Sequence, residues 1–307
     1  MSVDGTIGYG AAEAASVEAA VATFGRTILR ELSFCCTPIE LLSNDGELSR
    51  MAHATGFFYR HNDRQYLVTN WHVVSGRNPL TGLLESQQGY IPQRISFHGF
   101  EVFRNGTDVE FRRRRWRFEW GEEMAELLSQ PQTIDGRVVD LWAFPLPAGI
   151  LFEQDDARQI FVNSHTASCF VNDHANLDIG TASGDDCFIV GYPLSNYSGA
   201  MFPVWKRGSI ASEPLVGLGA YGAFLIDAAT TKGMSGSPVY RFQRGPAVLQ
   251  GERVTQVTGF NFIGIYGGRL QNRELESTNL GYAWLRSDLP RLIDQMKFAD
   301  FVATAAP

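Results

Sequence analysis

The sequence predicts a β-rich protein with many turns, of the barrel or sandwich class. From about residue 54 onward, short apolar runs alternate with turn residues, and long helical stretches are few. Glycine contributes 31 of the 307 residues, and aromatic residues make up 12% of the chain. Many short strands joined by regular turns are typical of barrels and sandwiches. The strand candidates are 55–60, 65–74, 94–103, 109–120, 138–146, 186–194, 201–212, 223–230, 236–242, 256–268 and 279–286.

One pair of these strands has a clear hairpin signal. Asn105-Gly106 stands between 94–103 and 109–120, and this dipeptide favours a tight two-residue turn because both residues tolerate positive φ. The second strand carries the basic run Arg112–Arg117, in which one tryptophan interrupts the arginines. Basic side chains among aromatic ones can bind phosphates and stack on bases. Nucleic-acid binding by this run is therefore one hypothesis.

An ordinary hairpin strand explains the same run better. In a strand, Trp116, Phe118 and Trp120 would share one face, and Arg115, Arg117 and Glu119 the other. The net charge of −7 also does not favour a nucleic-acid partner. We therefore expect no nucleic-acid partner for this run.

Helical patterns occur at both ends of the chain. Residues 12–33 place apolar side chains at helical spacing, which predicts an N-terminal helix packed on the body or used to bind a partner. Near the C-terminus, residues 287–298 form a second helical pattern. Ser287 is a plausible N-cap, and Pro290 lies in the first turn, where its missing N–H costs little.

The sequence also indicates in which cellular compartment the protein is expected. No stretch of about 18 consecutive apolar residues occurs, and the first 25 residues lack the basic start and apolar run of a signal peptide. We therefore expect no membrane partner and a cytoplasmic location. Free thiols are then the default for the four cysteines, and a Cys169–Cys187 bridge is the alternative that the sequence leaves open.

A glycine-flanked serine is the first candidate for chemistry. In Gly233-Met234-Ser235-Gly236 the glycines allow a sharp turn. A serine hydroxyl needs a base to accept its proton and N–H donors to hold the oxyanion that forms. The N–H groups of Gly233 and Ser235 could form that oxyanion hole. By itself the motif is weak, because an ordinary tight turn before a strand has the same composition.

A histidine and an aspartate strengthen this hypothesis. His72 follows an apolar strand, and Asp140 opens another. Alone, each is more often a core or capping residue, but with Ser235 they occur in the chain order His, Asp, Ser of one known type of catalytic triad. Asp108 and Asp135 are weaker candidates for the acid, since neither opens a strong apolar strand.

With these residues in place, the chain resembles the trypsin-like serine peptidases from about residue 54 to residue 297. Within that family it is most similar to the bacterial glutamyl endopeptidases, which carry a TTxGxSGSPV stretch and a later glycine-rich strand. The matching segments are Thr230–Val239 and Ile263–Gly268.

The resemblance implies a fold and a mechanism. The fold would be two six-stranded antiparallel Greek-key barrels, with an N-terminal helical extension over 1–50, the first barrel over 51–150, and the second barrel with the C-terminal helix over 151–307. Ser235 would attack a peptide carbonyl, His72 would act as general base, and Asp140 would orient the histidine. The partner would be a protein or peptide substrate, with no metal or cofactor. A catalytically silent binding module with the same fold is the alternative, and the oligomeric state is left open.

The chain departs from the family at several positions. Met234 stands where zymogen-activated members have an aspartate, so activity should not require a freshly cut N-terminus. The disulfides beside the histidine and the serine are also missing, since Val73 and Thr231 replace their cysteines. The other five histidines show no paired ligand spacing, so no zinc site is expected; they are His53, His61, His98, His165 and His174.

Specificity is less determined than mechanism. By position in the family, the primary pocket would be lined by Thr230, Tyr266 and the backbone of Gly267-Gly268. Tyr266 replaces the histidine of the glutamyl endopeptidases, so their preference is not carried over, and it could instead fill space and shorten the pocket. Lys232 and Arg269 would lie near the pocket mouth, either to attract acidic substrates or as solvated surface charges.

Overall fold

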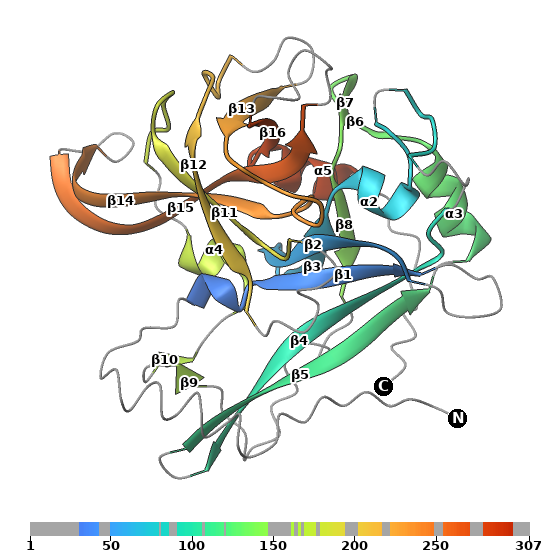
Figure 1. The fold of residues 1–307 in the computed structure, drawn as a ribbon, viewed down its shortest axis with the longest axis horizontal. Helices are drawn as coiled ribbons and strands as arrows, with labels where there is room; N and C mark the ends of the chain where they lie inside the picture. The colour runs from blue at the N-terminus through green and yellow to red at the C-terminus, as the bar shows by residue number, and fades with distance from the viewer. Residues whose placement is uncertain are drawn as a thin grey trace.

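A computed structural model describes the chain as two antiparallel β-assemblies with short helices around them (Figure 1). This confirms the prediction of a β-rich protein. The described residues are 31–42, 50–79, 81–85, 91–105, 108–119, 121–146, 161–162, 165–166, 169–175, 179–193, 202–216, 222–248, 254–270 and 279–296.

The first assembly is an open six-stranded sheet with the strand order β5-β4-β1-β2-β3-β8. Its centre is a Greek key, because β4 returns to lie beside β1 after three consecutive strands. Its strands are β1 (Cys36–Leu42), β2 (Arg50–His61), β3 (Arg64–Thr69), β4 (Arg94–Asn105), β5 (Asp108–Glu119) and β8 (Trp142–Pro145).

The second assembly is a closed six-stranded barrel with the order β11-β12-β13-β16-β15-β14. It contains the same Greek key, since β14 returns to lie beside β11. The predicted second barrel is therefore confirmed. Its strands are β11 (Asp186–Gly191), β12 (Val204–Ile210), β13 (Ala223–Asp227), β14 (Pro238–Val248), β15 (Val254–Arg269) and β16 (Leu280–Leu285).

The first assembly has the six antiparallel strands and the Greek key that were predicted, but among the described residues it is open and does not close into a barrel. Its strand order matches that of the second barrel, except that β5 and β8, the counterparts of β15 and β16, do not pair. The β4–β5 hairpin explains the difference. It is paired along both strands, but only Arg94, Ile95 and Ser96 of β4 are in register with β1, so most of the hairpin projects away from the sheet (Figure 1).

The boundary predicted at residue 50 is also corrected. The strand β1 lies within the proposed extension, yet it is central to the first sheet and pairs with both β2 and β4. Of the predicted helix 12–33, only Glu31–Ser33 lies among the described residues, where it forms a short 3₁₀ helix.

The helices are short. The predicted C-terminal helix is observed as α5 (Asp288–Gln295), with Ser287 at the N-cap and Leu289, Leu292 and Ile293 buried. No helix in the described part of the chain is long and apolar enough to cross a membrane. The remaining short elements are α2 (Trp71–Ser75), α3 (Glu122–Ser129), α4 (Val171–His174), β6 (Gln132–Ile134), β7 (Arg137–Val139), β9 (Phe161–Val162) and β10 (His165–Thr166).

The predicted hairpin at residue 105 is confirmed. Asn105 pairs with Asp108 at its end. Trp116 and Phe118 are buried on one face of β5, while Arg115 and Glu119 are exposed on the other, as strand alternation predicts. Trp120 lies outside the described residues.

One hydrophobic cluster joins the two assemblies. It includes Phe57 and Val68 from the first sheet and Phe262 and Ile265 from the barrel. Such shared apolar burial fixes the two assemblies against each other. The four cysteines are buried thiols outside any disulfide, so the Cys169–Cys187 bridge is not formed.

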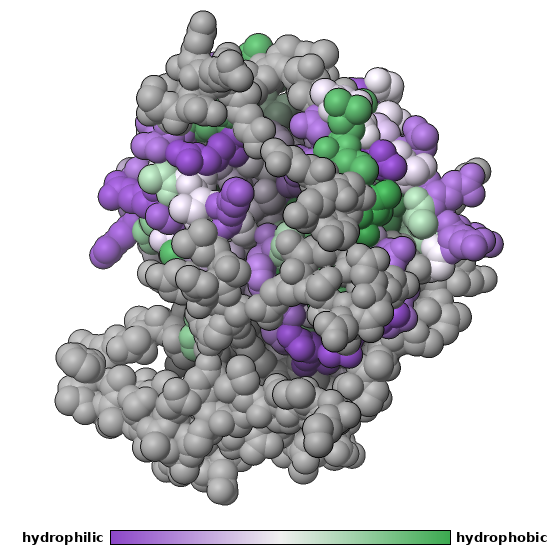
Figure 2. All heavy atoms as spheres, turned by 45° about the vertical axis from the view of Figure 1, so that its right-hand side comes forward, coloured by the Kyte–Doolittle hydropathy of each residue, from purple (hydrophilic) through white to green (hydrophobic). Residues whose placement is uncertain are grey.

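The surface that carries α2 and α3 has an apolar component. Figure 2 shows a stripe of hydrophobic side chains among hydrophilic ones on this side of the molecule. The exposed large hydrophobic residues from this region are Leu83 and Leu84, in the loop after α2, and Leu127 of α3. This loop begins four residues after His72, which makes it part of the surroundings of the site described next.

Candidate active site

His72 lies in α2, the helical turn that follows strand β3. Asn70 is the extended N-cap residue, and Gly76 ends the helix in the left-handed region with φ of 66°. Trp71, Val73 and Val74 are buried and hold the helix in place. The His72 side chain retains 12% exposure, so the ring is held firmly but can be reached from solvent.

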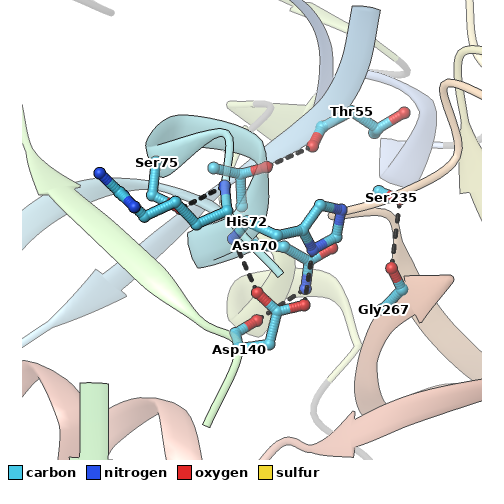
Figure 3. Close-up of polar contacts among 9 residues, drawn as sticks. Thr55, Asn70, His72, Ser75, Asp140, Ser235 and Gly267 are labelled. Carbon is cyan, nitrogen blue, oxygen red and sulfur yellow. Dashed lines mark hydrogen bonds and ion pairs between the residues drawn. The ribbon is translucent and has the colours of Figure 1, made fainter. Parts of the chain in front are cut away.

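Asp140 lies between β7 and β8 and is fully buried. Its Oδ2 is 2.6 Å from Nδ1 of His72, and its Oδ1 accepts the backbone N–H of the same residue at 2.8 Å. The side chain of Asn70 donates to the main-chain oxygen of Asp140 at 2.8 Å. These contacts fix both the orientation of the imidazole and the nitrogen that faces the carboxylate (Figure 3).

The pKa of His72 reflects two opposing effects. Burial lowers the pKa of His72, but the charge of Asp140 and the hydrogen bond to it raise the pKa, with a further contribution from the charge of Glu85. The net result is a pKa above the ordinary histidine value. A histidine of this kind binds a proton more tightly than an isolated one, which suits a group that must accept a proton during a reaction.

Ser235 occupies a tight turn at the start of β14. Gly233 and Gly236 have φ of 95° and 83°, a region that favours glycine. The Gly236 N–H donates to the carbonyl of Tyr266, and the Ser237 N–H to that of Met234. The sequence prediction that glycines permit a sharp turn at Ser235 agrees with this geometry.

The hydroxyl of Ser235 does not donate to His72 in this structure. It donates to the carbonyl of Gly267 at 3.1 Å. In Figure 3 the imidazole lies between Asp140 and Ser235, with its second nitrogen turned toward the serine. The hydroxyl proton must therefore leave the carbonyl of Gly267 before it can reach the histidine.

Two backbone N–H groups beside Ser235 are free to bind a ligand. Neither the N–H of Gly233 nor that of Ser235 donates a hydrogen bond to any group in the described part of the chain. Both belong to the turn that the sequence proposed as an oxyanion hole. Free donors that are held in place by the fold can stabilise negative charge in a transition state.

The predicted specificity residues fall into a buried group and an exposed group. Thr230 and Tyr266 are each only 2% exposed, and their hydroxyls are hydrogen-bonded at 2.5 Å. A Cβ on Gly281 would lie 2.5 Å from the Tyr266 hydroxyl, so the tyrosine fills the space there. Lys232 and Arg269 are exposed, and Arg269 donates to Asn279 at 3.3 Å.

A β-bulge brings Gly267 to the serine. The pairing of β15 with β16 shifts between Tyr266 and Gly268, which leaves Gly267 as the extra residue. A Cβ at Gly267 would lie 2.1 Å from the ring of Tyr282, so only glycine fits. The bulge aims the Gly267 carbonyl at Ser235, whereas the sequence assigned Gly267 and Gly268 to the pocket wall.

Several residues that matter here had no signal in the sequence. Glu85 acts on His72 through its charge, Asn70 anchors Asp140, and Thr55 contacts the serine turn. The sequence held no pattern that marks them, apart from the position of Asn70 two residues before His72.

The other sequence candidates lie elsewhere. Asp135 pairs with Arg291 on the surface, and Asp108 lies at the end of the β4–β5 hairpin. Met234 is buried in the barrel core. Among the described residues, no group of three or more histidine, cysteine or acidic side chains could hold a metal ion.

Comparison with known proteins gives only distant likenesses. No protein-family model matches this chain, and no curated protein matches it. Among solved structures, it is similar to the inactive form of Rv3671c from M. tuberculosis in which a serine is replaced by alanine, at 15% identity over 92% of each chain and a TM-score of 0.42.

Two further solved structures are similar to this chain at comparably low identity and TM-score. One is the inactive form of the Rv3671c protease, at 15% identity over 92% of this chain and 96% of that one, with a TM-score of 0.40. The other is a thermostable serine protease, AL20, from an extremophilic microorganism, at 13% identity over 86% of this chain and 97% of that one, with a TM-score of 0.44. TM-scores of 0.40 to 0.44 are too low for these likenesses to support an activity.

Proposed function

We propose that the chain is a serine endopeptidase that uses Ser235 as nucleophile, His72 as general base and Asp140 to orient the histidine. The observation that carries this proposal is the contact of 2.6 Å between the buried carboxylate of Asp140 and Nδ1 of His72, with Ser235 facing the other side of the ring. The chain also resembles the trypsin-like peptidases in the motifs that carry these three residues.

The reaction follows from this arrangement. Once the hydroxyl of Ser235 has left the carbonyl of Gly267, it gives its proton to Nε2 of His72 as the oxygen attacks a peptide carbonyl. The negative oxygen that forms would bind to the N–H groups of Gly233 and Ser235. The protonated His72 then gives the proton to the departing amine, which leaves an ester on Ser235. Water, deprotonated by His72, cleaves that ester and restores the serine.

Asp140 has a supporting role in both halves of the reaction. Because its carboxylate accepts a hydrogen bond from Nδ1–H, the neutral ring keeps its proton on Nδ1 and its lone pair on Nε2, toward the serine. The same carboxylate stabilises the imidazolium that forms after the proton transfer.

A second candidate is a binding module without turnover. The observation in its favour is that the Ser235 hydroxyl donates to Gly267 at 3.1 Å and not to His72. If a bound partner held this conformation, the serine would remain unreactive.

A fluorophosphonate probe separates the two candidates, since it reacts only with an activated serine. We expect the wild-type protein to be labelled at Ser235, and the label to be lost in Ser235→Ala and in His72→Ala. Digestion of a peptide library by the wild type then tests for cleavage within chains. Absence of labelling at every pH from about 6 to 9, a range that begins near the ordinary histidine pKa and extends above it, would contradict the enzyme and favour the binding module.

A further inference from the structure

Thr55 is a fully buried residue of β2 that lies where the first sheet meets the second barrel. Its hydroxyl donates to the carbonyl of Gly233 at 2.8 Å and accepts the N–H of Tyr192 at 2.9 Å. Its own N–H donates to the carbonyl of Ser235 at 2.9 Å. Every polar group of this one residue is therefore committed to a partner, once its carbonyl is included as described below.

The two carbonyls that Thr55 binds bracket the turn of the nucleophile. Gly233 and Ser235 are also the residues whose N–H groups are proposed to hold the oxyanion. All the other hydrogen bonds of residues 233–237 in the described part of the chain stay within the second barrel, to Thr231, Met234, Tyr266 and Gly267. Among these residues, Thr55 therefore provides the hydrogen bonds from the first assembly to the serine turn.

Thr55 is linked to the histidine as well. Its carbonyl accepts the hydroxyl of Thr69 at 2.9 Å, and Thr69 ends the strand three residues before His72 (Figure 3). Thr69 pairs in turn with Trp142, two residues after Asp140. A short chain of hydrogen bonds thus runs from the serine turn, through Thr55 and Thr69, to the strands that hold the His72–Asp140 pair.

Close packing leaves this junction little freedom to shift. A Cβ on Gly236 would lie 2.1 Å from the carbonyl oxygen of Thr55 and 2.4 Å from the hydroxyl of Thr69. A Cβ on Gly191 would lie 2.7 Å from the hydroxyl of Thr55. Backbones approach so closely only because glycine stands at both positions. The position of the serine relative to the histidine is therefore determined at this junction.

We propose that Thr55 is a positioning residue, whose hydroxyl sets the Gly233–Ser235 turn against the histidine-bearing segment. This inference rests on the proposed peptidase activity and extends it to a residue outside the triad. Loss of the hydroxyl would leave the Gly233 carbonyl without its donor, and the turn would shift relative to His72. Small displacements of reacting groups reduce rates strongly, by about a hundredfold for 1 Å.

Three variants test the role of Thr55. Thr55→Val removes the hydroxyl and keeps the branched shape, and Thr55→Ser keeps the hydroxyl. Thr37→Val is the matched control, because Thr37 is also a fully buried threonine, on the neighbouring strand β1, and its hydroxyl bonds to the N–H of His98 at 2.8 Å and to the carbonyl of Pro38 at 3.3 Å instead of to the serine turn.

The first measurement is the rate of fluorophosphonate labelling and of peptide cleavage per folded molecule, with folding verified by a thermal unfolding curve. We expect Thr55→Val to lower kcat by about ten- to hundredfold with little change in KM. Thr55→Ser should restore most of the rate, and Thr37→Val should keep it. The pH at half-maximal activity should stay the same in Thr55→Val, because the His72–Asp140 contact is untouched. A rate for Thr55→Val equal to that of the wild type, or an equal loss in Thr37→Val, would overturn the inference.

The second measurement does not depend on activity. Hydrogen exchange of the peptide segment 233–238 should be faster in Thr55→Val than in the wild type or Thr37→Val. If the wild type is never labelled by the probe, the proposed activity fails, and unchanged exchange in Thr55→Val would separately overturn the positioning role. If Thr55→Val does not fold, Thr69→Val replaces it, and its exchange and labelling rate should change in the same directions by a smaller factor; no change in either would again refute the inference.

Discussion

At the scale of single residues, the candidate site joins groups with opposite requirements. Asp140 is fully buried, where a charge is costly, and its two oxygens accept hydrogen bonds from the backbone and the ring of His72. The hydroxyl of Ser235 donates to the carbonyl of Gly267. The candidate site therefore combines a fixed His72–Asp140 pair with a serine hydroxyl that is hydrogen-bonded elsewhere.

The raised pKa of His72 predicts the pH dependence of activity. Only the neutral imidazole can accept the serine proton, so kcat/KM should rise with pH and level off above a pKa higher than about 6.5, the ordinary histidine value. In Asp140→Asn the negative charge is lost, and we expect both a fall in that pKa and a loss of kcat of about 10⁴-fold, the loss such a change causes in a well-characterised triad. A pH–rate profile of both proteins checks this. A profile that is flat between about pH 5 and 9 would rule out His72 as the base.

The raised pKa of His72 also makes the stability of the folded protein depend on pH. Because the pKa of His72 is higher in the folded protein than in the unfolded chain, its interaction with Asp140 contributes stability that is fully present below the unfolded pKa of about 6.5. That contribution is lost as the pH rises through the folded pKa. Activity and this part of the stability therefore change in opposite directions with pH.

Glu85 offers a milder test of the same electrostatics. Its charge helps to raise the pKa of His72, so Glu85→Gln should lower that pKa and move the rising limb of the pH–rate profile toward lower pH. The plateau rate should remain within about twofold, because Glu85 makes no hydrogen bond to His72 and the effect is electrostatic. A matched control is Glu126→Gln, on the exposed side of α3. An equal shift in both variants would show that net charge, and not the location of Glu85, is responsible.

At the scale of elements, the β4–β5 hairpin is attached to the sheet by a partly buried ion pair. Arg115 of β5 is 2.5 Å from the carboxylate of Glu40 in β1, and the hydroxyl of Ser96 donates to the same oxygen at 3.0 Å. The Glu40 side chain is only 4% exposed, whereas that of Arg115 is 43% exposed. The Glu40 carboxylate has little access to water, so its charge is compensated by this contact more than that of Arg115 is.

Removal of the cation should therefore destabilise the fold. We expect Arg115→Met to lower the free energy of unfolding by about 1–3 kcal/mol, less than the about 3–5 kcal/mol of a fully buried pair because solvent screens the exposed guanidinium. Arg117→Met, two residues along on the same face, should change it by less than about 0.5 kcal/mol, as is usual for surface substitutions. Urea denaturation measures both. Equal effects in the two variants would show that the Glu40 contact contributes nothing specific.

The elements also show why the sequence was informative in some places and not in others. Local motifs identified Ser235, His72 and Asp140, because glycines, a strand end and a strand start leave patterns within a few residues. The strand β1 was missed because all seven of its residues are buried, which removes the polar–apolar alternation, and because Pro38 interrupts it. Thr55 was missed because its partners, Gly233 and Ser235, are about 180 residues away in the chain, a contact that no local pattern records.

At the scale of the whole molecule, the two assemblies share one strand order and one hydrophobic cluster. The first differs from the second by the absent pairing of β5 with β8, which leaves a projecting hairpin on one side of the molecule (Figure 1). The cluster that includes Phe57 and Phe262 spans the junction, close to the hydrogen bonds of Thr55. Because this shared cluster and the hydrogen bonds of Thr55 hold the two assemblies against each other, we expect them to unfold together.

The four cysteines allow this cooperativity to be measured. Cys35 and Cys36 belong to the shared cluster, Cys169 to the cluster of the first sheet, and Cys187 to the barrel core. Burial raises the pKa of Cys187 to about 12 and that of Cys36 above its ordinary value, so thiolate is scarce in the folded protein at neutral pH. We expect almost no reaction with a thiol reagent under native conditions and four reactive thiols in denaturant.

Across a urea titration, mass spectrometry of the labelled peptides should show all four sites becoming reactive at one midpoint, because loss of the shared cluster exposes both assemblies at once. Two separate midpoints, with Cys187 apart from Cys169, would show that the barrel unfolds independently of the sheet that holds His72 and Asp140.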